Sequence, residues 1–319
     1  MREIAPRQAD RERGVRQGCD DGPGRAQDTV LLLRMLQDQD GNLVVHFIGH
    51  CRDIDCAAMN VTVLVHDSVV KLPSEADGAV VIGGSHGAVY AAHMSAKFGC
   101  RAAIHHDAGI GKDEAGVGGL AYAQKVGMAM AAVATASARI GDGADMMARG
   151  IISRANDLAA HCGVRAGMSC REAADLLRAA PWPHRVPPKM GETRHIVDGF
   201  PCVDSSSLLV AGDRGGIVAT GSHCALNSGH AVEPFVPKLV FFNDAGPGAD
   251  AGGILGFEVL DRAGIAGAAV AAGSARIGDG RSTLQDGIVS HVNRAARLLG
   301  AHVGSTALAL ARAVAEKSS

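Results

Sequence analysis

Ser85 and His86 are the residues whose types and setting best suit covalent chemistry, within the segment Gly83-Gly-Ser-His-Gly87. The segment fits the G-x-S-x-G pattern of a nucleophile elbow, in which a tight turn between a strand and a helix exposes a serine hydroxyl. The helix N-terminus behind such a turn stabilises an oxyanion. The alternative is that Ser85 and His86 cap the helix and bind an anion through backbone N–H groups.

The same Ser-His pair occurs again 137 positions further along, at Ser222 and His223 (residues 85 and 222). Here Thr220 and Cys224 replace the flanking glycines, so the segment resembles the elbow of α/β-hydrolases only in part. Three more blocks recur at the same spacing, without insertion or deletion. They are Asp107-Ala-Gly-x-Gly-x-Asp113 with 244–250, Ser137-Ala-Arg-Ile-Gly-Asp-Gly143 with 274–280, and Gly150-Ile-x-Ser-x-x-Asn156 with 287–293. The spacing predicts an internal duplication.

Asp107 and Asp244 each precede a glycine-rich loop. A carboxylate at this point is suited to be a general base, a metal ligand or an acceptor for a substrate hydroxyl. It is also suited to shape the loop as an Asx turn. Gly109 and Gly111 suggest a nucleotide-binding loop, but the first-strand position and the downstream acidic residue of a dinucleotide fingerprint are missing.

Arg139 and Arg276 follow runs of small residues that are predicted to be strands. A guanidinium at a strand end is suited to clamp a substrate carboxylate or phosphate with two hydrogen bonds. The competing interpretation is an internal ion pair with Asp142 or Asp279, three residues on. Such a pair would fix its loop and could also join the two copies across a pseudo-twofold axis.

His86 and His93 are two helical turns apart, which would place them on one face of a helix. Together with Asp107 they are candidate ligands for a divalent metal. The chelating i, i+4 spacing is absent, so the alternative is one surface histidine and one buried, hydrogen-bonded histidine. The identity of any cofactor stays open, with a divalent metal as the candidate.

The two copies differ at positions that favour the first copy as the catalytic one: His106 becomes Asn243, and Lys112 and Glu114 become alanines. The leading hypothesis is an enzyme that hydrolyses an amide or ester-like bond in a small, polar, anionic substrate. Ser85 is then the nucleophile or an oxyanion-side donor, His86 or His106 the base, and Asp107 the residue that orients it. The predicted substrate-binding residues are Gly84, Gly109, Gly111, Asp113, Arg139, Asp142, Ser222, His223, Asp244 and Arg276.

Two other functions stay open. The first is a metal-assisted lyase or isomerase that uses His86, His93 and Asp107. The second is a non-catalytic protein that holds a small molecule between the two copies.

Strands alternating with helices must position these residues. In the first copy the pattern predicts strands at 78–82, 102–106 and 128–135, and helices at 88–97, from 119, at 144–162 and at 170–180. Further strands are expected at 43–48 and 61–68, and a last helix at 305–316. Ser153 and Asn156 would share one face of the helix at 144–162.

This alternation predicts an α/β fold of two Rossmann-like βαβ halves with parallel sheets and a pseudo-twofold relation. Ligands are then expected at the carboxyl ends of the strands. The first repeat is predicted at 29–180, a proline-rich linker at 181–194 and the second repeat at 195–319. Residues 1–28 interleave six arginines with six acidic residues, which predicts a disordered tail.

Composition narrows the function further. The 319 residues carry 31 basic and 33 acidic side chains, so no basic field favours nucleic acid. Eight cysteines without a C-x-x-C pair predict free thiols in a reducing compartment. The most apolar run, 263–275, is too short to span a bilayer. We therefore expect a cytoplasmic protein with a small-molecule substrate and no nucleic-acid or membrane partner, and homo-oligomerisation stays open.

Overall fold

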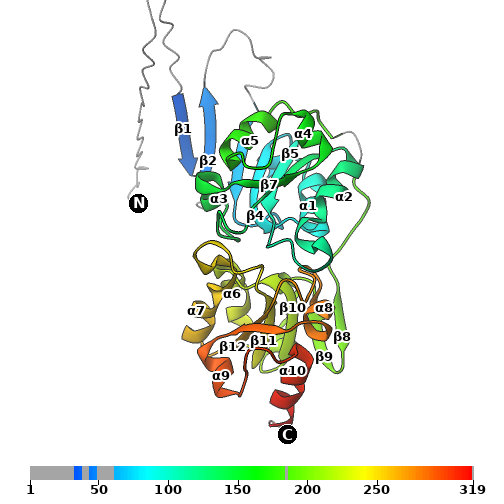
Figure 1. Ribbon diagram of the computed structural model, residues 1–319, viewed down its shortest axis with the longest axis vertical. Coiled ribbons are helices and arrows are strands. Elements are labelled where there is room, and N and C mark those ends of the chain that lie inside the picture. The colour runs from blue at the N-terminus through cyan, green and yellow to red at the C-terminus, as the bar shows by residue number, and fades with distance from the viewer. Residues whose placement is uncertain (1–31, 38–42, 49–60, 184–185, 318–319) are drawn as a thin grey trace, which may run out of the picture.

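The computed structural model describes residues 61–183 and 186–317, together with the strands β1 (Leu32–Gln37) and β2 (Leu43–Ile48). The predicted tail at 1–28 lies outside the described residues. Two lobes are stacked along the long axis of the molecule, and each is a sheet flanked by helices (Figure 1). The predicted α/β class is therefore confirmed.

The first sheet has the strand order β1-β2-β3-β4-β5-β6-β7. Its four parallel strands are β3 (Val63–His66), β4 (Val80–His86), β5 (Ala102–His106) and β6 (Ala129–Val133). The flanking strands β2 and β7 (Ile152–Ala155) run antiparallel to their neighbours. The strand predicted at 102–106 is confirmed, whereas β4 runs four residues beyond the predicted end at Ile82 and includes the Gly-Ser-His segment.

Two layers of helices cover this sheet. On one face lie α1 (Val89–Lys97) and α2 (Gly119–Val126), and on the other α3 (Gly143–Arg149), α4 (Asp157–His161) and α5 (Cys170–Leu177). The strand order rises steadily with the sequence, so the crossovers from β4 to β6 place both of their helices on the same face. The order never reverses, so the switch point of a doubly wound sheet is absent from the described strands and the Rossmann-like part of the prediction is not confirmed.

The second sheet has the order β13-β12-β11-β10-β9-β8. Its parallel strands are β9 (Phe200–Val203), β10 (Ile217–His223), β11 (Leu239–Asn243) and β12 (Ala266–Val270), and its antiparallel edges are β8 (Arg194–Val197) and β13 (Val289–Val292). Its helices are α6 (Leu226–Val232), α7 (Gly256–Arg262), α8 (Gly280–Gln285), α9 (Arg294–Leu298) and α10 (Ala307–Glu316). β10, β11, β12 and β13 each start 137 positions after β4, β5, β6 and β7.

Short 3-10 helices complete the chain. They are η2 (Ser74–Ala76), η3 (Lys112–Val117), η4 (Ser206–Leu208), η5 (Ala211–Asp213), η6 (Glu233–Phe235) and η7 (Ala249–Ile254). The described residues of 181–193 hold neither helix nor strand, as expected of the proline-rich stretch. None of the described helices combines the length and the apolar character needed to cross a membrane.

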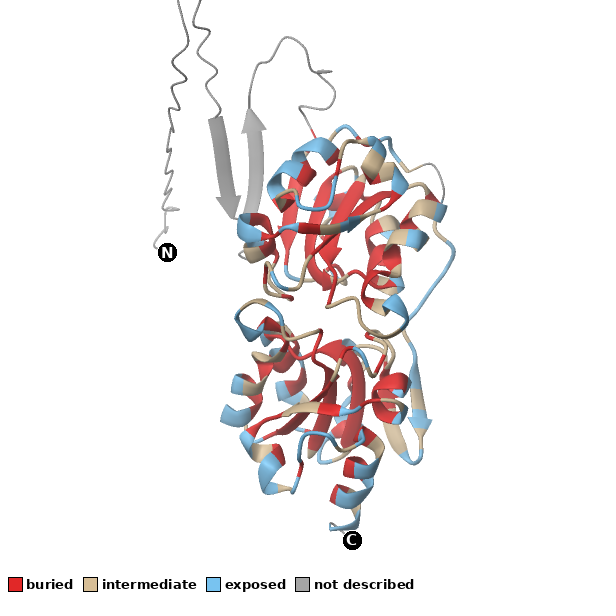
Figure 2. Cartoon of the chain, viewed as in Figure 1, coloured by how far each residue is buried: buried red, intermediate tan, exposed pale blue. Residues whose placement is uncertain are grey.

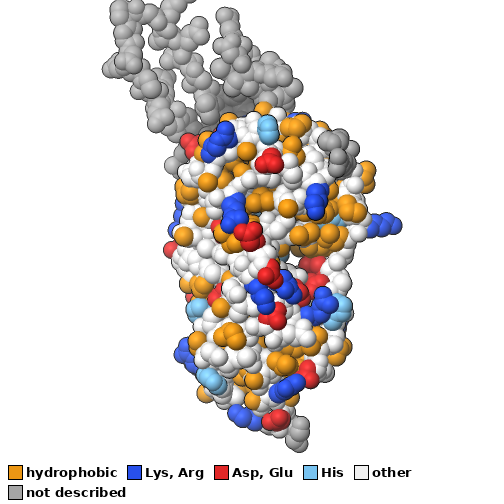
Figure 3. Space-filling view, turned by 45° about the vertical axis from the view of Figure 1, so that its right-hand side comes forward, with side chains coloured by type: hydrophobic (Ala, Val, Ile, Leu, Met, Phe, Trp, Pro, Cys, Tyr) orange, Lys and Arg blue, Asp and Glu red, His pale blue; other side chains and the backbone are white. Residues whose placement is uncertain are grey.

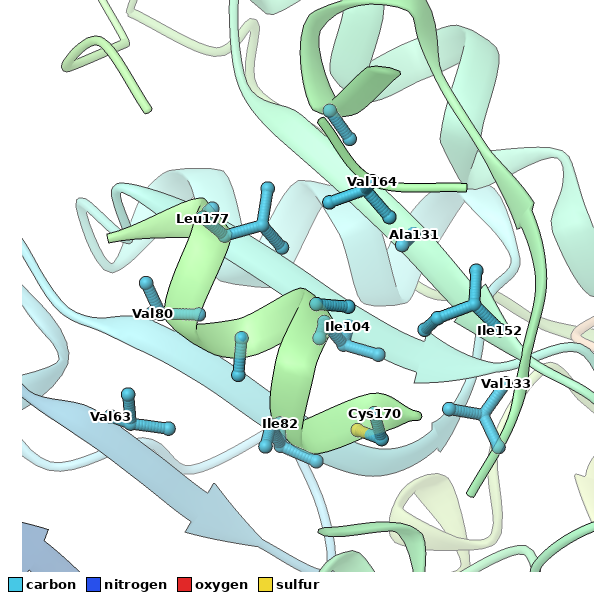
Figure 4. Packing of buried hydrophobic residues seen from close by; sticks show 14 of the residues in the cluster. Val63, Val80, Ile82, Ile104, Ala131, Val133, Ile152, Val164, Cys170 and Leu177 are labelled. Carbon is cyan, nitrogen blue, oxygen red and sulfur yellow. The ribbon is translucent and has the colours of Figure 1, made fainter. Parts of the chain in front are cut away.

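The central strands are apolar on both faces because helices cover both faces. Successive residues of a strand point to opposite sides, so Val80 and Ile82 pack with Ile104 and with Leu177 of α5 (Figure 4). Val81 belongs to the other layer, with α1 and α2. Each lobe has a buried core of this kind around its own sheet (Figure 2).

The long helix predicted at 144–162 is wrong. The chain there forms α3, the strand β7 and the short helix α4. Gly150 ends α3, and the β-branched pair Ile151-Ile152 favours the strand. Ser153 therefore lies in β7, whereas the Asn156 side chain caps α4 by accepting from Ala159 N (3.0 Å), and the two do not share a helix face.

Candidate functional site

The glycine-rich loops form the junction between the two lobes. Lys112 N donates to Ala272 O, and Ala249 N donates to Thr135 O, each at 2.8 Å. Between these bonds two glycines meet: a Cβ on Gly109 would lie 3.1 Å from the Cα of Gly246. The loops thus bring the carboxyl ends of the two sheets together, backbone against backbone. The substrate-binding role predicted for Gly109 and Gly111 is not supported, because their space is filled by the other lobe.

Small apolar side chains pack beside these loops. They form three pairs at the spacing of 137: Ala88 with Ala225, Ala108 with Ala245, and Ile140 with Ile277. All six are buried, so the junction has an apolar core of its own. This contact holds the turns that follow β4 and β10 at fixed positions relative to each other.

Arg139 and Arg276 form ion pairs at the edge of the junction. Arg276 binds Asp279 of its own loop (3.2 Å) and Asp113 of the first lobe (3.0 Å). Arg139 likewise binds Asp142 (2.9 Å) within its loop. Acidic and basic side chains gather in this middle part of the molecule (Figure 3). This geometry agrees with the interpretation of internal ion pairs that also join the lobes. It gives no support to a guanidinium clamp for substrate, nor to substrate binding by Asp113 and Asp142.

Asp107 and Asp244 shape the loops. Asp107 Oδ1 accepts hydrogen bonds from Gly109 N (3.0 Å) and Thr135 N (2.9 Å). Asp244 Oδ1 accepts the equivalent pair, from Gly246 N (2.9 Å) and Ala272 N (2.8 Å). Both carboxylates are buried. These bonds agree with the Asx-turn interpretation, in which each carboxylate holds its own loop.

His106 is a structural residue. Its Nε2 donates to Ala138 O (3.0 Å) and its Nδ1 accepts from Ala108 N (3.0 Å). Asn243 makes the same two bonds in the second lobe, to Ala275 O and from Ala245 N. Burial lowers the pKa of His106. The structure gives no support to His106 as the base, because backbone groups occupy both of its ring nitrogens.

The two Ser-His pairs do come together, in one cavity of about 520 Å³ between the lobes. Ser85 Oγ accepts a hydrogen bond from Val69 N (3.1 Å), and Ser222 Oγ accepts one from Ser206 N (2.9 Å). The polar and charged residues of the lining are His66, Asp67, Ser68, Lys71, Ser85, His86, Tyr90, Glu192, Ser205, Ser206, Ser207, Ser222, His223, Asn227 and Ser228.

Ser85 does not sit in a nucleophile elbow. It is the penultimate residue of β4, and its φ is not positive as the strained elbow turn would require. Gly84 contributes no contact to the cavity, because it packs against the Gly141–Asp142 backbone. Ser85 is nevertheless held towards the cavity at the strand end.

His86 and His223 face each other across the junction, with ring centroids 6.3 Å apart and planes at 82°. Burial, reinforced by neighbouring His106, lowers the pKa of His86 to about 4. Burial and the nearby His86 lower the pKa of His223 to about 3. Both rings are neutral at pH 7. Within the described chain the buried Nδ1 of His86 has no hydrogen-bond partner, whereas that of His223 accepts from Ala225 N (3.2 Å).

Glu192 is a site residue that sequence reasoning missed. It lies in the stretch predicted to be the linker, lines the cavity, and accepts a hydrogen bond from Ser207 Oγ at 3.5 Å. Burial and the negative charge of Asp204 raise its pKa to about 7. Glu192 lies outside the repeated blocks, so the repeat spacing gives no means of finding it.

The metal hypothesis gains no support. No three side chains among the His, Cys, Asp and Glu of the described residues gather as a ligand group. His93 Nδ1 is hydrogen-bonded to Tyr122 Oη (2.9 Å), and Asp107 binds the loop backbone. His86, His93 and Asp107 therefore do not converge.

Glu192→Gln should change how stability depends on pH. The raised pKa means that the folded state holds the proton more tightly than the unfolded state, whose pKa is near 4.5. The free energy of unfolding of the wild type therefore falls as pH rises from about 4.5 to about 7. Glutamine does not titrate, so the variant does not lose this stability. The free energy of unfolding of the variant, relative to that of the wild type, should therefore be about 1–2 kcal/mol higher at pH 8 than at pH 4. Urea denaturation at both pH values measures it, and an equal gain from Glu75→Gln, at an exposed glutamate, would contradict it.

Comparison with protein-family models, with curated proteins and with solved structures finds no match for this chain.

Proposed function

We propose that the protein is an enzyme that acts on a small polar substrate in the cavity between its lobes, by hydrolysis of an amide or ester-like bond. The observation that carries the proposal is that Ser85 and His86 meet Ser222 and His223 in one cavity, beside the titratable Glu192. We further propose that the lobes descend from an internal duplication and are related by a pseudo-twofold axis. The reciprocal bonds of Lys112 with Ala272 and of Ala249 with Thr135 support that relation.

In the proposed reaction Ser85 Oγ adds to the substrate carbonyl carbon. Glu192 takes the serine proton through an intervening water and passes it to the leaving amine or alcohol as the carbonyl–heteroatom bond breaks. A water molecule then adds to the acyl carbon, its proton returns to Ser85, and the acid is released. A pKa of about 7 suits Glu192 to this transfer, whereas His86, with its pKa of about 4, is a weak base at neutral pH. Its neutral ring is suited to hydrogen-bond the substrate.

Charge in the cavity gives no preference for an anion, because Lys71 is accompanied by Asp67 and Glu192. We therefore propose a polar substrate without requiring a negative charge. Lys71, and not Arg139, is the Lys or Arg side chain in the cavity lining.

A fluorophosphonate probe tests the serine chemistry. We expect it to label the wild type and Ser222→Ala, but not Ser85→Ala. Glu192→Gln should slow labelling about 100-fold, as expected when general-base assistance is lost. Ser222→Ala is the matched control, because Ser222 lines the same cavity and accepts an equivalent backbone hydrogen bond. An unlabelled wild type, or labelling retained in Ser85→Ala, would remove the hydrolase proposal.

Non-catalytic binding is the second candidate, and one observation favours it. Among the described residues, Ser85 Oγ is hydrogen-bonded to Val69 N and to no histidine. The same cavity would then hold a ligand that leaves unchanged. Two results together would identify non-catalytic binding: the fluorophosphonate probe does not label the wild type, and a bound ligand is recovered intact after incubation with the protein.

A further inference from the structure

The cavity wall is built from matching positions of the two lobes. Seven pairs of its lining residues are 137 positions apart, among them Ser85 with Ser222 and His86 with His223. A cavity made of two identical halves would present the same chemistry on both sides. Differences between paired residues therefore report what each side contacts.

Four of the seven pairs differ, all in the same direction. The first lobe has the less polar residue and the second lobe the more polar one. The pairs are Val69 with Ser206, Val70 with Ser207, Tyr90 with Asn227, and Ala91 with Ser228. At these four positions the first lobe thus presents aliphatic side chains and a ring, and the second lobe presents hydroxyl and amide groups; the other lining residues of both lobes are mostly polar.

The polar wall is an ordered hydrogen-bonding surface. Ser222 Oγ donates to Ser206 Oγ (3.3 Å), and Ser228 Oγ lies 3.4 Å from His223 Nδ1. Ser206 and Ser228 are both buried. Buried hydroxyl groups in such a wall favour a ligand group that completes their hydrogen bonds, because an unmatched polar group costs free energy.

We propose that the ligand of this cavity is amphipathic, with an apolar, ring-sized group against the partly exposed Val70 and Tyr90 and an uncharged hydroxyl or amide head against the serines of the second lobe. An aromatic ring beside Tyr90 gains offset or edge contacts in addition to apolar burial. An uncharged head suits a wall whose groups both donate and accept. This inference deepens the proposed function, on which it rests for the identity of the cavity, by naming the class of substrate.

Three small probes test the inference by titration calorimetry or ligand-observed NMR: benzamide, which has both parts, malonamide, which has only the polar part, and toluene, which has only the apolar part. We expect the wild type to bind benzamide at least about tenfold more tightly than either of the others, since each wall adds about a tenfold gain. Equal binding of the three probes, or binding of none, would overturn the inference.

Exchanging residues between the walls locates the preference. Tyr90→Asn and Val70→Ser should each weaken the binding of benzamide about tenfold and leave the affinity for malonamide unchanged. Ser207→Val should weaken the binding of benzamide and leave the affinity for toluene unchanged or higher. Each variant introduces the residue that the other lobe carries at the matching position, and all three sites are partly or fully exposed, which favours folding. Loss of all three probes to the same extent in Tyr90→Asn and Ser207→Val contradicts the two-walled cavity.

Repeating the titrations in Ser85→Ala separates this inference from the proposed function. Suppose that Ser85→Ala still prefers benzamide and that fluorophosphonate does not label the wild type. The amphipathic ligand would then be supported, and hydrolysis would be rejected. Labelling of Ser85 without any preference among the probes would reject the amphipathic ligand alone.

Discussion

Gly84→Ala is expected to lower the free energy of unfolding by about 3 kcal/mol. A Cβ at this position would lie 2.7 Å from Asp142 N and 2.8 Å from Asp67 O, both backbone atoms. The loop cannot move away without loss of the bond from Gly141 N to Gly84 O, 2.8 Å long. Ser85 follows directly, so the strain should also displace the candidate nucleophile. Urea denaturation measures the stability, and the rate of fluorophosphonate labelling measures the displacement.

Gly273→Ala is the matched control. A Cβ at Gly273 meets no atom within 4 Å, and the first lobe has Ala136 at the matching position. We expect its stability to change by no more than about 0.5 kcal/mol. Similar losses at Gly84 and Gly273 would mean that the close packing of Gly84 against the loop is not what requires a glycine there.

Asn156→Ala is expected to cost about 3–5 kcal/mol. The Asn156 Oδ1 accepts hydrogen bonds from Met130 N and Ala159 N, each 3.0 Å, and its Nδ2 donates to Met128 O (2.9 Å). Alanine would leave three backbone groups in a buried region without partners. Denaturation followed by circular dichroism measures the loss.

Ser153→Ala, three residues away, provides the comparison. Ser153 makes one hydrogen bond, to Ala132 O at 3.2 Å, from a partly exposed position. Its loss should cost about 1 kcal/mol or less. A smaller effect at Asn156 than at Ser153 would show that the Asn156 bonds do not tie α4 to β6.

Local sequence patterns predicted much of the fold. The apolar run 102–106 is β5, and the helices predicted at 88–97 and from Gly119 are α1 and α2. Glycines flank both helices, and all five residues of β5 are buried, so local pattern and tertiary packing agree. At 144–162 they disagree: alanines and polar residues favour a helix, but Ile152 pairs with Val133 at the sheet edge. Edge pairing depends on a distant strand, which no local window contains.

The candidate site was predicted in part for a similar reason. Residues at the carboxyl ends of strands do meet, which brought Ser85, His86, Ser222 and His223 together. The spacing could not distinguish a loop that faces a ligand from one that faces the other lobe, and so Asp107, Arg139 and Gly109 were assigned to the site although they hold the junction. Glu192 reaches the cavity from an irregular segment whose path only the structure gives.

The main-chain bonds between Lys112 and Ala272 and between Ala249 and Thr135 have one more consequence. Backbone amide and carbonyl groups are present whatever the side chains are. Substitutions in the cavity lining can therefore change the walls and leave these two hydrogen bonds between the lobes in place. Opening and closing of one lobe on the other would have to break them. The cavity is therefore preorganised when the chain folds, and little conformational entropy remains to be lost when a molecule enters.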